Sequence, residues 1–180
     1  MRLLFVGPPG AGKGTQAGRV ADKLGIAHVS TGDMFRALDD STDLGRRVKA
    51  IMESGDYVPD SIVIEMLEGR IEEDDAANGY ILDGFPRTVP QAEALDEFLG
   101  PDGLDAVVLF EIGTSEVVSR MLERGRADDT EETIRTRLEV YAEQTEPLIG
   151  RFDDQGLVRR VDAEGDIEDV TERVLATLDV

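Results

Sequence analysis

The chain has 180 residues, 41% of them hydrophobic, a length that suits one α/β core with small insertions. Its 39 acidic residues outnumber the 19 Lys and Arg, and the net charge of -20 argues against nucleic acid or an anionic membrane as a partner, because both would be repelled. The absence of cysteine and the single histidine exclude disulfides, thiolate zinc sites and histidine metal clusters, so a metal would need oxygen ligands. No signal-peptide pattern and no apolar span of about 18 residues occur, so we expect a cytoplasmic protein.

Short apolar runs alternate with amphipathic stretches along the chain. Runs typical of buried strands lie at 2–6, 80–82, 106–110 and 157–161. Helical spacing of apolar residues is found at 13–24, 61–72, 90–99, 115–124 and 130–149. The polar stretches 38–46, 72–79 and 125–131 are predicted loops. Alternation of this kind predicts a parallel sheet covered by helices.

A glycine-rich turn joins the first predicted strand to the first predicted helix. It reads Gly7-Pro8-Pro9-Gly10-Ala11-Gly12-Lys13-Gly14-Thr15. Glycines let backbone N–H groups converge on phosphate oxygens, and the N-terminus of a helix together with a lysine adds positive charge. The turn therefore predicts a phosphate-binding loop, although Gly14 stands where the common pattern has Ser or Thr, and the hydroxyl follows at Thr15.

An acid follows the second apolar run, at Asp83. A carboxylate at the end of a strand is the usual second acid of a phosphate-binding-loop enzyme, where it holds magnesium or its waters. We expect Asp83 and Thr15 to hold Mg²⁺ through water. A turn or helix-cap aspartate is the alternative.

The segments GPPGAGKGTQ (7–16) and DGFPRT (83–88) closely resemble those of adenylate kinases among the nucleoside monophosphate kinases, and the resemblance extends over the whole chain. It implies a three-layer α/β core with a five-stranded parallel sheet and a phosphate-binding loop. It also implies a monomeric enzyme that transfers phosphoryl reversibly from ATP to AMP with Mg²⁺, yielding ADP, for adenine nucleotide homeostasis and purine salvage.

The same resemblance divides the chain into a core and two inserted segments. The core comprises 1–29, 59–122 and 130–180. Residues 30–58 form an AMP-binding insertion, and residues 123–129 form a short lid without zinc.

The resemblance places the site for AMP, the phosphoryl acceptor, at two segments: STGD (30–33) and residues 83–91. Arg87 would clamp the AMP phosphate, because guanidinium groups match phosphate oxygens bidentately; a surface ion pair is the alternative. Thr31 and Gln91 would read the adenine, although alone they could be a cap hydroxyl and a solvent-facing helix residue. The predicted AMP contacts are Thr31, Arg36, Asp56, Tyr57, Val58, Gly84, Phe85, Pro86, Arg87, Gln91, Arg126 and Arg137.

Arginines concentrate between residues 120 and 137, against the negative charge of the chain. Transfer of a phosphoryl group needs such preorganised cations. If 130–149 is a helix capped by Asp128 or Asp129, Arg137 flanks its apolar stripe and Arg135 turns away. A solvated helix with Arg–Glu pairs is the alternative. The resemblance gives the catalytic set Lys13, Arg87, Arg124, Arg126 and Arg137, and the ATP contacts Gly10, Ala11, Gly12, Lys13, Gly14, Thr15, Arg120, Arg124 and Gly165.

Two rival functions remain. A sister kinase for CMP or UMP would turn over pyrimidine monophosphates faster, but such enzymes usually have Asn after the FPR triplet, where this chain has Thr88. A nucleotide-dependent switch would bind nucleotide without AMP-dependent consumption of ATP. The Asn-Lys-x-Asp motif of such GTPases does not occur in the sequence.

Overall fold

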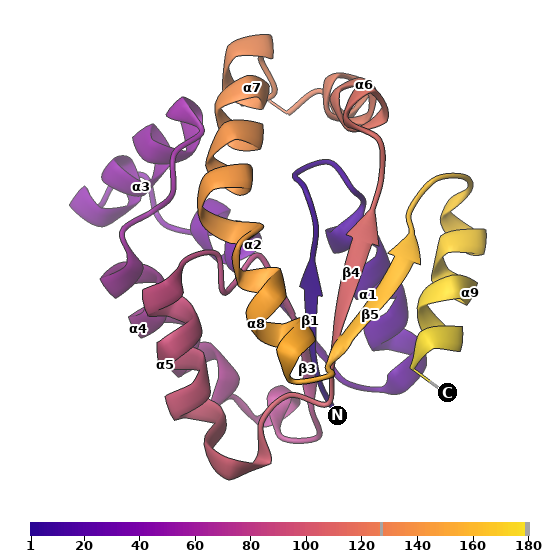
Figure 1. The fold of residues 1–180 in the computed structure, drawn as a ribbon. Helices are drawn as coiled ribbons and strands as arrows, with labels where there is room; N and C mark the ends of the chain where they lie inside the picture. The colour runs from indigo at the N-terminus through magenta and orange to yellow at the C-terminus, as the bar shows by residue number, and fades with distance from the viewer. Residues whose placement is uncertain (127, 179–180) are drawn as a thin grey trace.

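A computed structural model of the chain describes residues 1–126 and 128–178. Its parallel sheet has the strand order β2-β3-β1-β4-β5, as Figure 1 shows in part. The strands are β1 (Arg2–Val6), β2 (Ala27–Ser30), β3 (Tyr80–Asp83), β4 (Ala106–Glu111) and β5 (Val158–Asp162). Four of them were predicted within one residue at each end. The edge strand β2 carries no continuous apolar run, and only the family resemblance implied a fifth strand.

The helices surround the sheet and agree with most predicted helical stretches. They are α1 (Lys13–Leu24), α2 (Thr31–Arg36), α3 (Asp43–Ser54), α4 (Asp60–Ile71), α5 (Val89–Leu99), α6 (Thr114–Arg124), α7 (Glu131–Val140), α8 (Leu148–Asp154) and α9 (Ile167–Thr177). Short 3-10 turns lie at Asp74–Ala76 and Gly100–Asp102. The predicted loop 38–46 was too long, because Thr42 caps α3 by accepting from the Gly45 N–H at 3.0 Å.

The predicted helix 130–149 was wrong in its length and in its cap. α7 ends at Val140, a π-helical turn follows at Tyr141–Thr145, and α8 begins after Pro147. Thr130 caps α7, its Oγ1 accepting from the Thr133 N–H at 3.2 Å. The two aspartates before Thr130 bind arginine side chains, so they are not available as caps.

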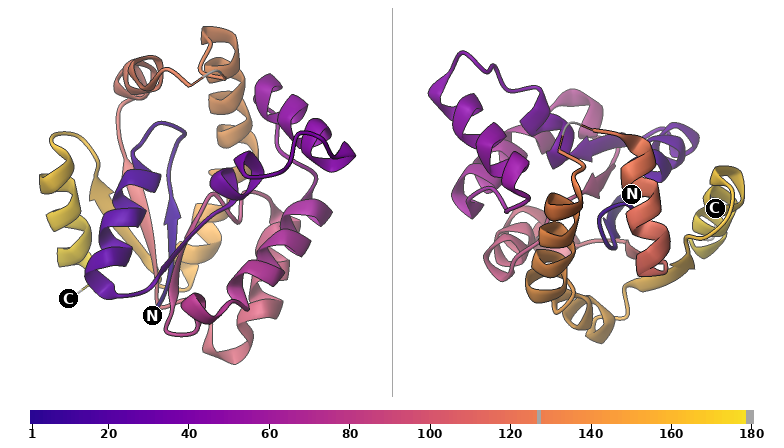
Figure 2. Two further views of the ribbon diagram at one scale, coloured as in Figure 1. Left: turned by 180° about the vertical axis from the view of Figure 1, so that it is seen from behind. Right: turned by 90° about the horizontal axis from the view of Figure 1, so that it is seen from above.

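The core lies in two layers, one on each face of the sheet. Successive strand residues point to opposite faces, so Leu3 and Phe5 pack toward α1 and α9, whereas Leu4 and Val6 pack toward α4, α5 and α8. Figures 1 and 2 show these helices on the two sides of the sheet. The arrangement is the three-layer α/β fold that the sequence predicted.

Because the strands are parallel, their carboxyl ends share one edge. The loop after β1, Ser30 at the end of β2 and Asp83 at the end of β3 meet there, with Ser30 and Phe5 both in register with Asp83. Helices α6 and α7 lie beyond this edge (Figure 1). Such an edge is where ligands bind in open α/β sheets.

Within the described ranges, no helix combines the length and the apolar character that crossing a membrane requires.

Candidate active site

A cleft of about 840 Å³ opens at the carboxyl edge of the sheet. Its volume suits a small-molecule site. The predicted site residues that line it are Gly10, Ala11, Gly12, Lys13, Gly14, Thr15, Arg36, Asp56, Tyr57, Val58, Asp83, Gly84, Arg87, Gln91, Arg120, Arg124, Arg126, Arg137 and Gly165. Thr31, Phe85 and Pro86 are not among its lining residues. The fold thus gathers residues from well-separated segments of the chain around one space.

The loop after β1 turns tightly because its glycines, Gly7, Gly10 and Gly12, have positive φ. Gly10 has φ +86, and a Cβ there would lie 2.7 Å from Met121 Cγ and 3.0 Å from the Val117 carbonyl oxygen, both on α6. Gly12 has φ +89 and caps α1. These conformations and this close approach both favour glycine. They turn the loop back over the N-terminus of α1, which carries the positive end of the helix dipole.

Lys13 lies in the first turn of α1, and its Nζ donates to the carbonyl oxygens of Gly7 and Pro8 at 2.7 and 2.8 Å. Desolvation of its ammonium lowers the pKa from 10.5 to about 8. The Asp83 charge opposes that shift, while Arg87 adds to it. The ammonium therefore sits where an anionic ligand would stabilise its charge.

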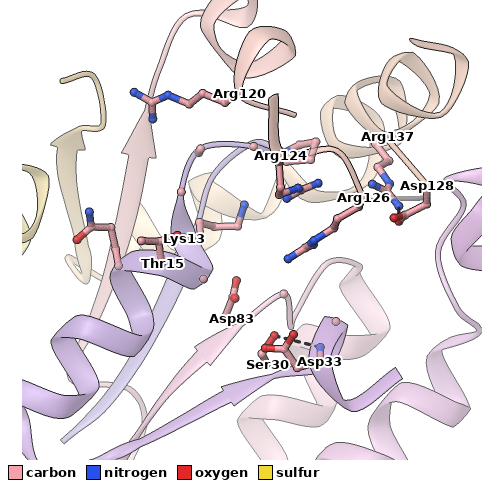
Figure 3. Close-up of a pocket in the computed structure, with 18 of the residues that line it drawn as sticks. Lys13, Thr15, Ser30, Asp33, Asp83, Arg120, Arg124, Arg126, Asp128 and Arg137 are labelled. Atoms are coloured by element: carbon pink, nitrogen blue, oxygen red, sulfur yellow. Dashed lines mark hydrogen bonds and ion pairs between the residues drawn. The ribbon is translucent and has the colours of Figure 1, made fainter. Parts of the chain in front are cut away.

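Asp83 points from the end of β3 toward Lys13 (Figure 3). Its side chain is 14% exposed, and burial alone would raise its pKa. Neighbouring His28 together with the charges of Lys13 and Arg87 outweighs burial and lowers the pKa, so Asp83 is ionised.

The closeness of Asp83 explains why Gly14 stands where the common loop pattern has Ser or Thr. A Cβ at Gly14 would lie 3.2 Å from Asp83 Oδ2, which is tighter than ordinary contact. Glycine lets the Asp83 carboxylate lie against the start of α1. The Thr15 side chain is exposed toward the same region (Figure 3).

The segment after β3 holds Arg87 by its own backbone. Arg87 Nε donates to the Gly84 carbonyl oxygen at 2.7 Å, and its Cζ lies 5.0 Å from the ring centroid of Tyr57. The Tyr57 hydroxyl in turn contacts Thr145 Oγ1 at 2.8 Å. These contacts fix the guanidinium beside the cleft. Arg87 forms no ion pair with any residue that the structure describes, so the alternative of a surface ion pair is wrong.

Three predicted acceptor residues lie behind the cleft. Thr31 is buried, and its Oγ1 donates to the Gly84 carbonyl oxygen at 3.0 Å. Phe85 is 1% exposed and packs in the core. Pro86 lines a smaller neighbouring pocket with Phe85. Their side chains therefore support the segments around the cleft, and direct contact of these residues with AMP stays a prediction.

The other acceptor residues border the cleft from the insertion and from α5. Arg36 Nη2 pairs with Asp33 Oδ1 at 2.6 Å on the surface of α2. Asp56 Oδ2 accepts from the Ser54 hydroxyl at 2.9 Å. Val58 is buried. Gln91 lines the cleft although only 1% of it is exposed, and its Oε1 accepts from the Arg87 N–H at 2.8 Å.

The Asp129 carboxylate holds the arginines of the opposite wall together. Its side chain is fully buried, and both oxygens accept from Arg124, at 2.7 and 2.9 Å. Arg137 Nη1 lies 3.2 Å from Asp129 Oδ1, and Arg137 also pairs with Asp128. The Arg126 N–H donates to Asp129 Oδ2 at 3.1 Å. One carboxylate thus sets the spacing of three chain segments that carry arginines.

Arg126 and Arg120 extend in different directions from this wall (Figure 3). Arg126 reaches into the cleft toward Asp33, and burial, followed by the charges of Arg124 and Arg36, lowers its pKa. Arg120 instead lies on the side of α9, where it pairs with Glu116 at 2.8 Å and donates to a backbone carbonyl at 3.0 Å. That helical pair follows the spacing of the solvated-helix alternative.

The Arg135 side chain is 73% exposed and pairs with Glu139, so it turns away from the cleft as predicted. Gly165 lines the cleft, as does Ala163, and has φ +98. Its contact with ATP stays a prediction.

Neither Asp129 nor His28 was predicted to position other residues. RGRADDT does place acids among arginines, but only the packing of α6 against α7 buries one of them. His28 lies in the strand that has no apolar run, so no local pattern marked it.

The comparisons with known proteins agree with the motifs. The family model described as "Adenylate kinase" matches residues 5–157. The chain belongs to the adenylate kinase family. An adenylate kinase of Nocardia farcinica is 52% identical over 181 aligned positions, which cover 99% of each chain. Adenylate kinases of Corynebacterium urealyticum and Thermobifida fusca are each 51% identical, covering 99% of this chain and 99% and 98% of theirs. As a family member, the protein is a nucleoside monophosphate kinase.

Among residues 1–126 and 128–178, no group of three or more His, Asp or Glu side chains could hold a metal ion by itself. In proteins Mg²⁺ is commonly bound through one or two carboxylates together with substrate phosphates. Asp83 and Thr15 are therefore candidates for a partial, oxygen-based site.

Proposed function

We propose that this enzyme transfers the γ-phosphoryl group of Mg-ATP to AMP and forms two molecules of ADP, reversibly. The observation that carries the proposal is the convergence of Lys13, Arg87, Arg124, Arg126 and Arg137 on one cleft, in a chain of net charge -20. Two nucleotides bring several negative charges together, and these cations offset their repulsion.

The donor nucleotide would lie on the side of the phosphate-binding loop. Backbone N–H groups of residues 10–15 and the Lys13 ammonium would bind its phosphates. Arg124 would bind the same phosphates, and the base would lie beside Arg120 and Gly165, which line the cleft. This division follows the positions of the side chains in Figure 3.

The acceptor nucleotide would lie between the insertion 30–58 and α5. Arg36 and Arg87 would bind its phosphate, with Arg126 and Arg137 between acceptor and donor. Gln91 would face the base, bordered by backbone and side chains of Asp56, Tyr57 and Val58. Thr31 would act by holding Gly84 in place.

The residues at the end of β3 and the start of α1 fit a magnesium ion. Mg²⁺ prefers hard oxygen ligands and keeps several waters, which suits an ionised Asp83 carboxylate and the Thr15 hydroxyl acting through water. When bound, the ion would neutralise phosphate charge. Asp83 would orient it, since the carboxylate is itself held by its basic neighbours.

Catalysis would rest on positioning and charge stabilisation, without a covalent intermediate on the enzyme. The insertion 30–58 and the short lid 123–129 would close on the core of 1–29, 59–122 and 130–180 and exclude water, which would otherwise hydrolyse ATP. Ala127 of this lid lies outside the described residues. We also propose that the enzyme works as a cytoplasmic monomer without zinc, in adenine nucleotide homeostasis and purine salvage.

The test is ADP formation from ATP with AMP, CMP, UMP or GMP as acceptor, with and without Mg²⁺, in a coupled assay. Magnesium-dependent turnover that prefers AMP supports the proposal. A preference for CMP or UMP would make the protein a sister kinase, and ATP binding without acceptor-dependent turnover would contradict phosphoryl transfer.

A further inference from the structure

Asp60 is the first residue of α4, just after the insertion, and its side chain is hydrogen-bonded to two residues at the start of α5. Its Oδ1 accepts two hydrogen bonds, from Gln91 Nε2 at 2.7 Å and from Thr88 Oγ1 at 2.9 Å. Thr88 is also the cap of α5, with its Oγ1 3.4 Å from the Gln91 N–H. The carboxylate is thus tied to the side chain of the residue that faces the acceptor end of the cleft.

These contacts allow the Gln91 amide only one orientation. A carboxylate only accepts hydrogen bonds, so it must face Nε2, and the backbone N–H of Arg87 only donates, so it must face Oε1. If the amide were turned over, its oxygen would meet the carboxylate and its NH₂ would meet an N–H. Gln91 is 1% exposed, so water could not make up for the two lost bonds.

The fixed amide keeps one N–H and one oxygen lone pair beyond those used by Asp60 and Arg87. Purines with different 6-substituents present different hydrogen-bond donors and acceptors to this N–H and lone pair. An adenine edge donates from its 6-amino group and accepts at N1, whereas a hypoxanthine or guanine edge accepts at O6 and donates from N1. A freely turning amide can pair with either edge, but an amide held in one orientation matches only one of them at a given base position.

We propose that Asp60 is a positioning residue that sets acceptor specificity: by holding the Gln91 amide in one orientation, it makes the site accept 6-amino purines and reject 6-oxo purines. This rests on the proposed function, in which Gln91 faces the acceptor base. Asp60 itself is not among the residues that line the cleft. Its effect therefore passes through Gln91.

The experiment compares AMP with IMP, which differ at the 6-position and N1 of the same purine. Dissociation constants come from calorimetry, and kcat/KM values come from the coupled assay. Asp60→Asn replaces the acceptor-only group with an amide that can face either end of Gln91. Asp43→Asn is the matched control, because it removes the same charge at the first residue of α3, where Asp43 is exposed.

For the wild type and the Asp43→Asn variant we expect strong preference for AMP in both measurements. For Asp60→Asn we expect the AMP-to-IMP preference to fall about tenfold or more, because the introduced asparagine can pair with either end of the Gln91 amide and only the Arg87 N–H then still favours one orientation. Part of that fall should come from tighter binding of IMP, which a merely structural loss would not produce. Preference in Asp60→Asn within about twofold of the wild type would overturn the proposal.

Asp60→Ser provides a second variant, since serine is well tolerated in the first turn of a helix and its hydroxyl both donates and accepts. It should lose preference as Asp60→Asn does, and thermal unfolding shows which variant is folded at the assay temperature. Retained preference in a folded Asp60→Ser variant would also contradict the proposal. Failure of the proposed function looks different, because the wild type would then show no AMP-dependent turnover.

Discussion

His28 Nε2 lies 3.5 Å from Asp83 Oδ2, across the neighbouring strands β2 and β3. This nitrogen is buried and makes no hydrogen bond with any residue that the structure describes. The contact is therefore electrostatic rather than a formed hydrogen bond. It is one of several influences that keep Asp83 ionised, beside the charges of Lys13 and Arg87.

Because His28 shares that task, we expect His28→Gln to change the magnesium-dependent kcat only a few-fold. Asp83→Asn should lower kcat by about 100-fold or more, since it removes the charged oxygen itself. The measurement is a Mg²⁺ titration of turnover for both variants. A loss in His28→Gln as large as that in Asp83→Asn would show that the imidazole has a more direct role.

The lowered pKa of Lys13 predicts a pH dependence for the binding of ATP. The folded-state pKa of about 8 lies below the ordinary lysine value of 10.5, so the free enzyme loses the ammonium charge as pH rises through 8. We expect kcat/KM for ATP to fall above about pH 8, where phosphate groups with a second pKa of about 6 are already fully ionised. We expect kcat to fall only at higher pH, because bound phosphates stabilise the ammonium.

The lowered pKa of Lys13 also predicts that the stability of the folded protein rises with pH, whereas the binding of ATP weakens. Between pH 8 and 10.5 the unfolded chain retains more protons at Lys13 than the folded chain. The free energy of unfolding of the wild type, relative to Lys13→Met, should therefore rise with pH in that window. A difference that stays flat in denaturant titrations, with a flat kcat/KM, would contradict the assignment.

Arg87→Ala should separate the two nucleotide sites. Arg87 is held by Gly84 and Tyr57 on the proposed acceptor side, so its loss should raise KM for AMP and lower kcat by about 100-fold. Binding of ATP, measured by calorimetry, should change little. Unchanged steady-state kinetics, or a loss confined to ATP binding, would place Arg87 outside the acceptor site.

Gly55 follows α3 in the insertion and packs against α7. Its substitution should change KM for AMP selectively. It has φ +87, and a Cβ there would lie 3.1 Å from the Thr133 carbonyl oxygen and 3.3 Å from Thr136 Cβ. A hydrogen bond also links α7 to α3, because Thr133 Oγ1 donates to the Glu53 carbonyl oxygen at 3.1 Å. Gly55→Ala should push the insertion from α7 and raise KM for AMP several-fold.

Gly25→Ala is the control for Gly55→Ala. Gly25 also follows a helix with positive φ, +66, but a Cβ there would meet no atom within 4 Å. Both variants should lose about 1 kcal/mol of stability from backbone strain, seen in thermal unfolding. Only Gly55→Ala should change KM for AMP, and an equal change in both would mean that strain, not the contact with α7, is responsible.

Local patterns in the sequence were sufficient for most elements and for the loop that would bind phosphate. Glycines between strand and helix, alternation of apolar runs, and an acid at the end of β3 are properties of neighbouring residues. Strand β2 and the true cap of α7 were not visible in this way. The first is an edge strand without an apolar run, and the second depends on which acids the arginines occupy.

The fold class, the family and the candidate phosphate-binding residues could be predicted from the sequence, because backbone freedom, hydrophobic period and charge are encoded locally. Which of these residues share a space, and which hold others in place, depends on how the separate elements pack. Asp129 among the arginines, Asp60 against Gln91 and Asp83 against Gly14 are pairs brought together by packing of separate elements. A buried carboxylate acts on whatever donors the fold brings to it, and that depends on distances in space rather than on spacing along the chain.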